Sequence, residues 1–155
     1  MRLFLVCCVV VAAGCGQQIG DSCIVASDCA IDGSRVCDNS QKDGYCTIAG
    51  CDYDTCPGES ECVRFFAGGF TNKPCGSNTD CSLDELCSLN DVCVPRSAET
   101  RFCMKKCSAA SDCRDGYECR NYDLMVSHGG EPVLAPGDTL DAADAPKFCA
   151  AAPAT

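Results

Sequence analysis

The chain has 155 residues, with 12 Lys and Arg against 22 Asp and Glu, and it contains 19 cysteines but no tryptophan. The formal net charge of −10 disfavours nucleic-acid binding, because affinity for phosphate groups comes from clustered cations. So many cysteines in a short chain with few aromatic residues indicate a fold held by disulfides in an oxidising compartment, with little conventional core.

Residues 1–14 predict a signal peptide. Arg2 precedes an unbroken apolar run from Leu3 to Ala13. As a helix this run would be only about 16 Å long, too short for a membrane core of about 30 Å. The run ends in Ala12-Ala13-Gly14-Cys15, which resembles a bacterial lipobox. The alternative is ordinary signal-peptidase cleavage near the same small residues.

The lipobox resemblance implies that Cys15 is diacylated and that residues 15–22 form a tether to the membrane. Removing Cys7, Cys8 and Cys15 from the 19 cysteines leaves sixteen, an even number that can pair completely. Cleavage just after Cys15 would leave the same number. Gly16 follows Cys15, where an Asp would be an inner-membrane retention signal, so the resemblance implies the outer membrane or cell surface. Without the lipid, the product would be secreted.

A repeated pattern of cysteine spacing follows the tether. A C-x5-C unit whose second cysteine follows Asp occurs three times, at Cys23–Cys29, Cys75–Cys81 and Cys107–Cys113. The repeat predicts a small disulfide-rich fold of tandem cysteine-rich modules, with short β-hairpins and little regular secondary structure. The expected organisation is a first module with a three-cysteine segment at 23–62, a linker at 63–74, a second module at 75–95, a third at 96–149 and a disordered tail at 150–155.

The spacing does not fix which cysteines pair, since even four cysteines allow three pairings. The simplest scheme joins the first with the third and the second with the fourth cysteine of every group. It gives Cys23–Cys37, Cys29–Cys46, Cys51–Cys62, Cys56–Cys103, Cys75–Cys87, Cys81–Cys93, Cys107–Cys119 and Cys113–Cys149. Residues 63–102 would then form an excursion that carries the middle module and is closed at its base by Cys56–Cys103.

The aspartate before the second cysteine of each module has two interpretations. It can accept a hydrogen bond from a nearby backbone N–H and cap a turn, or it can be a calcium ligand, which requires several converging oxygens. No D-x-D-x-D-G run is present, so we expect the cap. The Asp-Gly pairs at 43–44 and 115–116 predict short hairpins.

The pattern C-x5-C with Asp before its second cysteine, followed by two more cysteines, resembles the Dickkopf N-terminal cysteine-rich domain. It is still more similar to cysteine-rich lipoproteins of large-genome Gram-negative bacteria that share this likeness. The resemblance covers residues 23–149, and residues 102–119 are the part most like the family. In animals such modules are secreted regulators of receptor signalling, but the match is to cysteine spacing, so it does not imply that activity here.

We expect no enzyme, no cofactor and no metal site. The chain has one histidine, His128, in a glycine-containing stretch that offers no rigid positioning for a catalytic triad. No C-x-x-C redox pair occurs. Cys103 and Cys107 have the spacing of a zinc knuckle, but export favours their use in disulfides.

Two groups of side chains are candidates for binding. Phe65, Phe66 and Phe70 form either a local mini-core or an exposed apolar contact patch. Arg101, Lys105 and Lys106 belong to a cluster of basic residues that is either a solvated face or a contact for an anionic glycan, a lipid headgroup or an acidic protein. The whole cluster comprises Arg96, Arg101, Lys105, Lys106, Arg114 and Arg120.

The sequence thus predicts a non-enzymatic, lipid-anchored cell-surface protein that acts as an adhesion or ligand-binding module. Its expected partners are the membrane, through the N-terminal lipid, and an unknown protein or glycan, with no nucleic acid. One alternative is a secreted protease-inhibitor-like miniprotein that presents an exposed loop around Arg101 or Lys105. A second alternative is a structural envelope lipoprotein.

Overall fold

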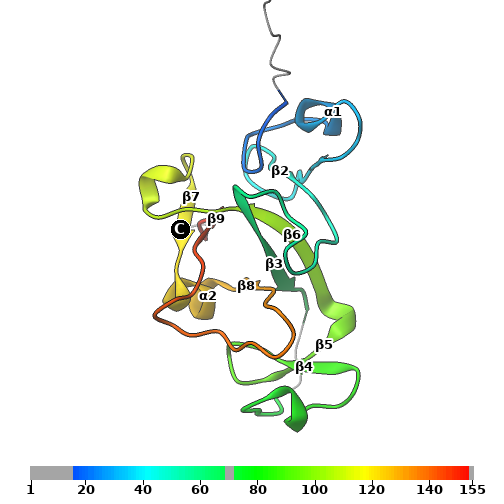
Figure 1. Ribbon diagram of the computed structural model, residues 1–155, viewed down its shortest axis with the longest axis vertical. Helices are drawn as coiled ribbons and strands as arrows, with labels where there is room; N and C mark the ends of the chain where they lie inside the picture. The colour runs from blue at the N-terminus through cyan, green and yellow to red at the C-terminus, as the bar shows by residue number, and fades with distance from the viewer. Residues whose placement is uncertain (1–15, 69–71, 154–155) are drawn as a thin grey trace, which may run out of the picture.

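The computed structural model describes residues 16–68 and 72–153. The predicted signal peptide, Cys15 and Phe70 lie outside the described residues. The fold is elongated, with the first module at one end of the long axis and the middle module at the other (Figure 1). No helix among the described residues is long and apolar enough to cross a membrane.

Eight disulfides divide the described chain into four units. In each unit the first cysteine is joined to the third and the second to the fourth, and the eight pairs are those of the scheme given above. The third and fourth cysteines of every unit lie directly opposite each other on two antiparallel strands. These opposed pairs are Cys37 and Cys46, Cys62 and Cys103, Cys87 and Cys93, and Cys119 and Cys149. The chain is therefore four copies of one small disulfide motif.

Three of these units are the modules that the repeat predicts, each with a short helical turn and a two-stranded sheet. The first module contains α1 (Ala26–Cys29), β1 (Val36–Cys37) and β2 (Cys46–Thr47). The middle module contains η1 (Asn78–Asp80), β4 (Glu85–Cys87) and β5 (Cys93–Pro95). The third contains η3 (Ala110–Asp112), β7 (Tyr117–Arg120) and β9 (Phe148–Ala151).

The fourth unit, which we call the central unit, is built from Cys51, Cys56, Cys62 and Cys103 and carries the largest sheet. β3 (Ser60–Phe66) lies between β6 (Glu99–Lys105) and β8 (Glu131–Pro132). β3 and β6 pair over their full length. Residues 63–66 are therefore part of a strand, and the linker expected from residue 63 is wrong there. The strand continues here because Val63 is fully buried directly after the buried Cys62, so this part of β3 has core contacts on both faces of the sheet.

Two connecting segments complete the fold. η2 (Arg96–Ala98) leads from the middle module into β6. α2 (Tyr122–His128) separates β7 from β8, and its first turn is capped by Asn121, whose Oδ1 accepts a hydrogen bond from the Leu124 N–H at 3.0 Å. His128 is thus the last residue of a helix, with its Nδ1 2.8 Å from Glu118 Oε1. His128 therefore lies in regular structure, so the stretch without rigid positioning expected from the sequence is wrong at this residue.

The first, central and third units share one hydrophobic core, which the composition did not predict. Ile19, Val63 and Phe148 are fully buried, and they come from the N-terminal segment, the central sheet and the third module. Each short element contributes only one or two apolar residues, so no periodic stripe marks the core in the sequence. Ile19 also corrects the tether expected over residues 15–22, since the Gly20 N–H donates to the Cys46 carbonyl at 2.9 Å and holds this segment on the first module.

The C-terminal residues correct a further expectation. The tail predicted to be disordered from residue 150 begins as strand, because β9 continues to Ala151 and pairs with β7. Ala150 is buried, and the Ala152 N–H donates to the Gly116 carbonyl at 3.0 Å. A methyl side chain is enough to anchor this strand where the core is already built by its neighbours.

Candidate functional site

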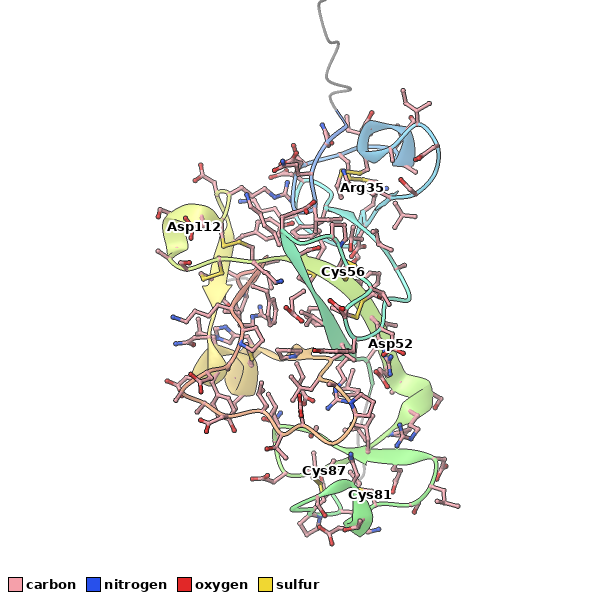
Figure 2. The ribbon with its side chains drawn as sticks, viewed as in Figure 1. Arg35, Asp52, Cys56, Cys81, Cys87 and Asp112 are labelled. Atoms are coloured by element: carbon pink, nitrogen blue, oxygen red, sulfur yellow. A yellow bond between two sulfur atoms is a disulfide. The ribbon has the colours of Figure 1, made fainter. Side chains whose placement is uncertain are left out.

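A groove with a volume of about 530 Å³ lies between the middle module and the rest of the molecule. The middle module contributes Ser77, Leu89 and Asp91, and the end of β8 with the segment after it contributes residues 132–140. The central unit contributes Asp52, Arg64, Arg101 and Glu131. Figure 2 shows Asp52 on the central unit, and Cys81 and Cys87 on the middle module. The groove therefore has walls from two separately cross-linked units.

A buried carboxylate, Glu131, connects the two walls. Arg64 on β3 lies opposite Glu131 on β8 in the sheet register, and its Nη2 is 2.8 Å from Glu131 Oε2. The second oxygen of Glu131 accepts a hydrogen bond from the Leu89 N–H of the middle module at 2.6 Å. Glu131 is only 5% exposed, so its charge depends on these partners for stabilisation. One buried carboxylate thus connects the central sheet to the middle module.

A second arginine lies beside the first. Arg101 is directly opposite Arg64 in the pairing of β3 with β6, and like charges in that position repel. Arg101 is neutralised by Glu99, 2.5 Å away, and by Asp52, 3.0 Å away. The hydrogen bond from Arg101 to Glu99 raises the pKa of this guanidinium above its ordinary value. The groove wall therefore carries two permanent positive charges with acidic neighbours, an arrangement suited to binding polar groups of either sign.

The structure resolves the two interpretations of the aromatic residues in favour of a local core. The ring centroid of Phe65 lies 6.5 Å from that of Phe102 and 6.4 Å from that of Phe148. Phe66, at the end of β3, has the Arg64 guanidinium 5.7 Å from its ring centroid. Both rings are half-buried. These two phenylalanines do not form an exposed contact patch.

The basic cluster is largely used within the molecule. Lys106 pairs with Glu61 at 3.4 Å, and Arg101 is paired as described above. The Arg114 guanidinium lies 5.6 Å and 4.2 Å from the ring centroids of Tyr45 and Tyr117. Arg120 is buried. Lys105 is half-buried and lines a smaller cavity of about 300 Å³ beside Tyr45 and Arg114. Since most of these cations have internal partners, the cluster is not a free anion-binding face.

The cysteines also bring sulfur atoms together in groups that have the size of a metal site. In each unit three sulfur atoms lie within 4.8 Å of one another, as Cys23, Cys29 and Cys37 do. Every member of these groups is in a disulfide. A metal needs the thiolate form of cysteine, so these sulfur atoms are not available as ligands.

Arg64 and Glu131 are groove residues that sequence reasoning missed. They are 67 positions apart and no motif surrounds either one. The only local signal was Arg64 itself, a basic residue directly after Cys62 and Val63 in an acidic chain. Comparison of the chain with protein-family models, with curated proteins and with solved structures found no match in any of the three.

Proposed function

We propose that this chain is a non-enzymatic, lipid-anchored protein of the bacterial cell surface that binds a protein or glycan ligand in the groove beside the middle module. The observation that carries the proposal is the groove itself, about 530 Å³ in volume, with paired charges along one wall. The lipobox-like sequence Ala12-Ala13-Gly14-Cys15 supports the anchor.

The cross-links make the groove a suitable binding site. Cys75–Cys87 and Cys81–Cys93 hold one wall, and Cys51–Cys62 and Cys56–Cys103 hold the other. Walls that are already ordered lose little conformational freedom when a ligand binds, so more of the contact energy contributes to affinity. The volume lies within the roughly 300–1,000 Å³ of small-ligand sites, which fits a short segment of a larger partner.

The lining favours a ligand with many hydrogen-bonding groups. Ser77 and Thr139 offer hydroxyl groups, and Arg64 and Arg101 offer guanidinium donors. Tyr122 adds an aromatic ring that can pack on an apolar ligand face. This mixture matches a sugar chain or a polar peptide better than an apolar molecule.

The alternative of a protease inhibitor lacks the exposed loop that it requires. Arg101 and Lys105 lie within β6, where their backbone is paired with β3. A protease binds the reactive segment of an inhibitor as an added strand, which needs a free backbone edge. The second edge of β6 is also occupied, because the Gly50 N–H donates to the Arg101 carbonyl at 2.8 Å and the Cys103 N–H donates to the Ile48 carbonyl at 3.0 Å.

The proposal is tested with the native protein and one pair of tyrosine variants. Intact mass should show a diacylglyceryl group on Cys15 and a loss of sixteen hydrogens from cysteine pairing. Arrays of bacterial envelope oligosaccharides and of short peptides then supply the binding probes. We expect Tyr122→Ala to weaken the binding found with the wild type by about tenfold or more, as loss of a buried aromatic contact does.

Tyr53→Ala is the matched control, because Tyr53 is an exposed tyrosine that does not line the groove. It should leave binding unchanged. Equal loss in both variants, or no binding on either array, would contradict the groove as the ligand site. An unmodified Cys15 would contradict the anchor.

A further inference from the structure

Exposed aliphatic side chains are concentrated in the first module. Among the described residues, seven large hydrophobic side chains are exposed, and four of them lie between Cys23 and Cys46. These are Ile24 (81% exposed), Val25 (52%), Ile31 (97%) and Val36 (39%). We call these four residues the aliphatic patch. Single exposed apolar residues are normal, but four of them on one small unit favour a contact with another apolar phase.

The chain enters the fold at this same module. A Cβ placed on Gly16 would lie 3.8 Å from the carbonyl oxygen of Cys29, which ends α1. The Arg35 guanidinium donates a hydrogen bond to the Gln17 carbonyl, and Ile19 is fully buried. The first described residues are thus fixed to the body of the protein. In Figure 1 their dark blue ribbon lies beside α1.

This attachment changes the distance between a lipid on Cys15 and the first module. A flexible tether over residues 15–22 could reach about 26–29 Å. With the chain fixed from Gly16 onward, only one Cα–Cα step of about 3.8 Å separates Cys15 from residues packed on the module. An acyl group on Cys15 therefore holds the first module against the bilayer surface.

The charges around the patch indicate which kind of bilayer surface it fits. Between Cys23 and Cys46 there are four aspartates, Asp28, Asp32, Asp38 and Asp43, against Arg35 and Lys42. This acidic balance is repelled by anionic lipid, so a zwitterionic surface is favoured. The Asp28 carboxylate accepts hydrogen bonds from the N–H groups of Ile24 and Val25 at 2.8 and 3.0 Å, which holds these two patch residues in place.

We propose that the aliphatic patch of the first module lies in the interface of a zwitterionic bilayer, where the acyl anchor on Cys15 holds it. The proposal rests on the lipid anchor of the proposed function and adds a second, protein-made contact with the same membrane. Because the middle module lies at the opposite end of the long axis, this contact directs the groove wall that it carries away from the lipid (Figure 1).

Two tryptophan variants test this contact, since the chain has no tryptophan of its own. Ile31 and Leu83 are each two residues beyond the second cysteine of their module and are 97% and 101% exposed. Ile31→Trp and Leu83→Trp therefore place the same fluorophore at matching positions near opposite ends of the protein. Each full-length lipidated variant is reconstituted into phosphatidylcholine vesicles, with and without brominated acyl chains.

We expect the emission of Ile31→Trp to shift to the blue and to be quenched by the brominated lipid, since interfacial apolar groups lie about 5–10 Å into the headgroup and acyl boundary. Leu83→Trp should keep the emission of a water-exposed tryptophan and be quenched by aqueous iodide instead. Equal behaviour at the two positions, with the lipid present on Cys15, would overturn this proposal alone. A native Cys15 without lipid would overturn the proposed anchor together with this proposal.

Discussion

At the residue scale, the feature shared by the three modules is the aspartate before the second cysteine. Asp28, Asp80 and Asp112 each accept two backbone N–H hydrogen bonds from the residues just after the first cysteine, at 2.7–3.0 Å. These bonds stabilise the charged carboxylate and lower the pKa of all three aspartates. In the central unit Thr55 takes this place, with its Oγ1 accepting from the Asp52 N–H at 2.8 Å. The cap is thus part of the motif.

Asp112→Asn should lower the urea midpoint of unfolding, because a neutral amide accepts the N–H groups of Ser108 and Ala109 more weakly. A carboxylate with a lowered native pKa stabilises the fold above its ordinary pKa of about 3.9 and loses this effect as the pH falls through the native value. The midpoint difference from wild type should therefore be constant at pH 5–7 and shrink below pH 4. Asp115→Asn, at an exposed carboxylate of the same module, is the control. A difference independent of pH would refute the charged cap.

Two glycines allow the cost of left-handed backbone conformation to be measured separately from the cost of steric overlap by an added Cβ. Gly33 and Gly44 have φ of +75° and +64°, but a Cβ on Gly33 meets nothing within 4 Å, whereas one on Gly44 would lie 2.0 Å from the Cys23 carbonyl oxygen. Gly33→Ala should cost about 1–2 kcal/mol of unfolding free energy, the usual cost of left-handed backbone for a residue with a Cβ. Gly44→Ala should cost clearly more, since backbone must also move. Equal losses in urea unfolding would argue against this close approach.

At the scale of elements, Arg120 joins the ends of three segments. From β7 its guanidinium donates to the carbonyls of His128 and Gly129 at the end of α2, and to that of Ala151 at the end of β9. It also pairs with Glu118 at 2.9 Å, with only 5% of its side chain exposed. Burial lowers the pKa of Arg120, which reflects the cost of keeping this charge from water. One side chain therefore ties the end of α2 to the paired strands β7 and β9.

Arg120→Met should therefore lower the free energy of unfolding by about 3–5 kcal/mol, because Glu118 and three carbonyl groups lose a buried charged partner. Amide exchange should rise at Gly129, whose N–H donates to the Met125 carbonyl at 2.8 Å at the end of α2. Arg96→Met, at an exposed arginine, is the control and should change neither quantity. Unchanged exchange at the end of α2 would show that the helix does not depend on this arginine.

The elements that the sequence predicts are those whose determinants are local. The first and middle modules each have four cysteines, an aspartate and a short hairpin close together in the chain, and all of these are visible in the spacing. The pairing of β3 with β6 joins positions up to 45 residues apart, and the groove depends on Arg64 meeting Glu131. Such contacts depend on tertiary packing, so local sequence patterns contain no signal for them. The internal use of the basic cluster was not visible either, because partners such as Glu61 of Lys106 and Asp52 of Arg101 are distant in the chain.

At the scale of the whole molecule, the disulfides differ in what they hold together. Cys81–Cys93 closes a separation of 12 residues within the middle module, whereas Cys56–Cys103 closes 47 residues and encloses that module entirely. In the chain-entropy model, closing these two loops in the unfolded chain stabilises the fold by about 3 and about 4 kcal/mol, respectively. The larger difference lies in position, since Cys103 is fully buried in the shared core and the middle module adds no buried residue to that core. The central bridge therefore stabilises the units that share this core, and the middle module depends on its own two bridges.

Replacing both members of each bridge with serine should separate these roles. Cys81→Ser with Cys93→Ser should raise amide exchange in the middle module alone, since its own hairpin loses the support while the central sheet keeps both of its bridges. Cys56→Ser with Cys103→Ser should raise exchange in the central sheet and in the third module, because β9 packs on β6 through the same core. Exchange is measured by mass spectrometry with the remaining seven disulfides confirmed intact by mass.

If the two double variants loosen the same residues, the middle module is not an independent unit carried by the central sheet. If the central variant changes only its own strands, the core does not couple the modules, and each unit is stable through its own sulfur alone.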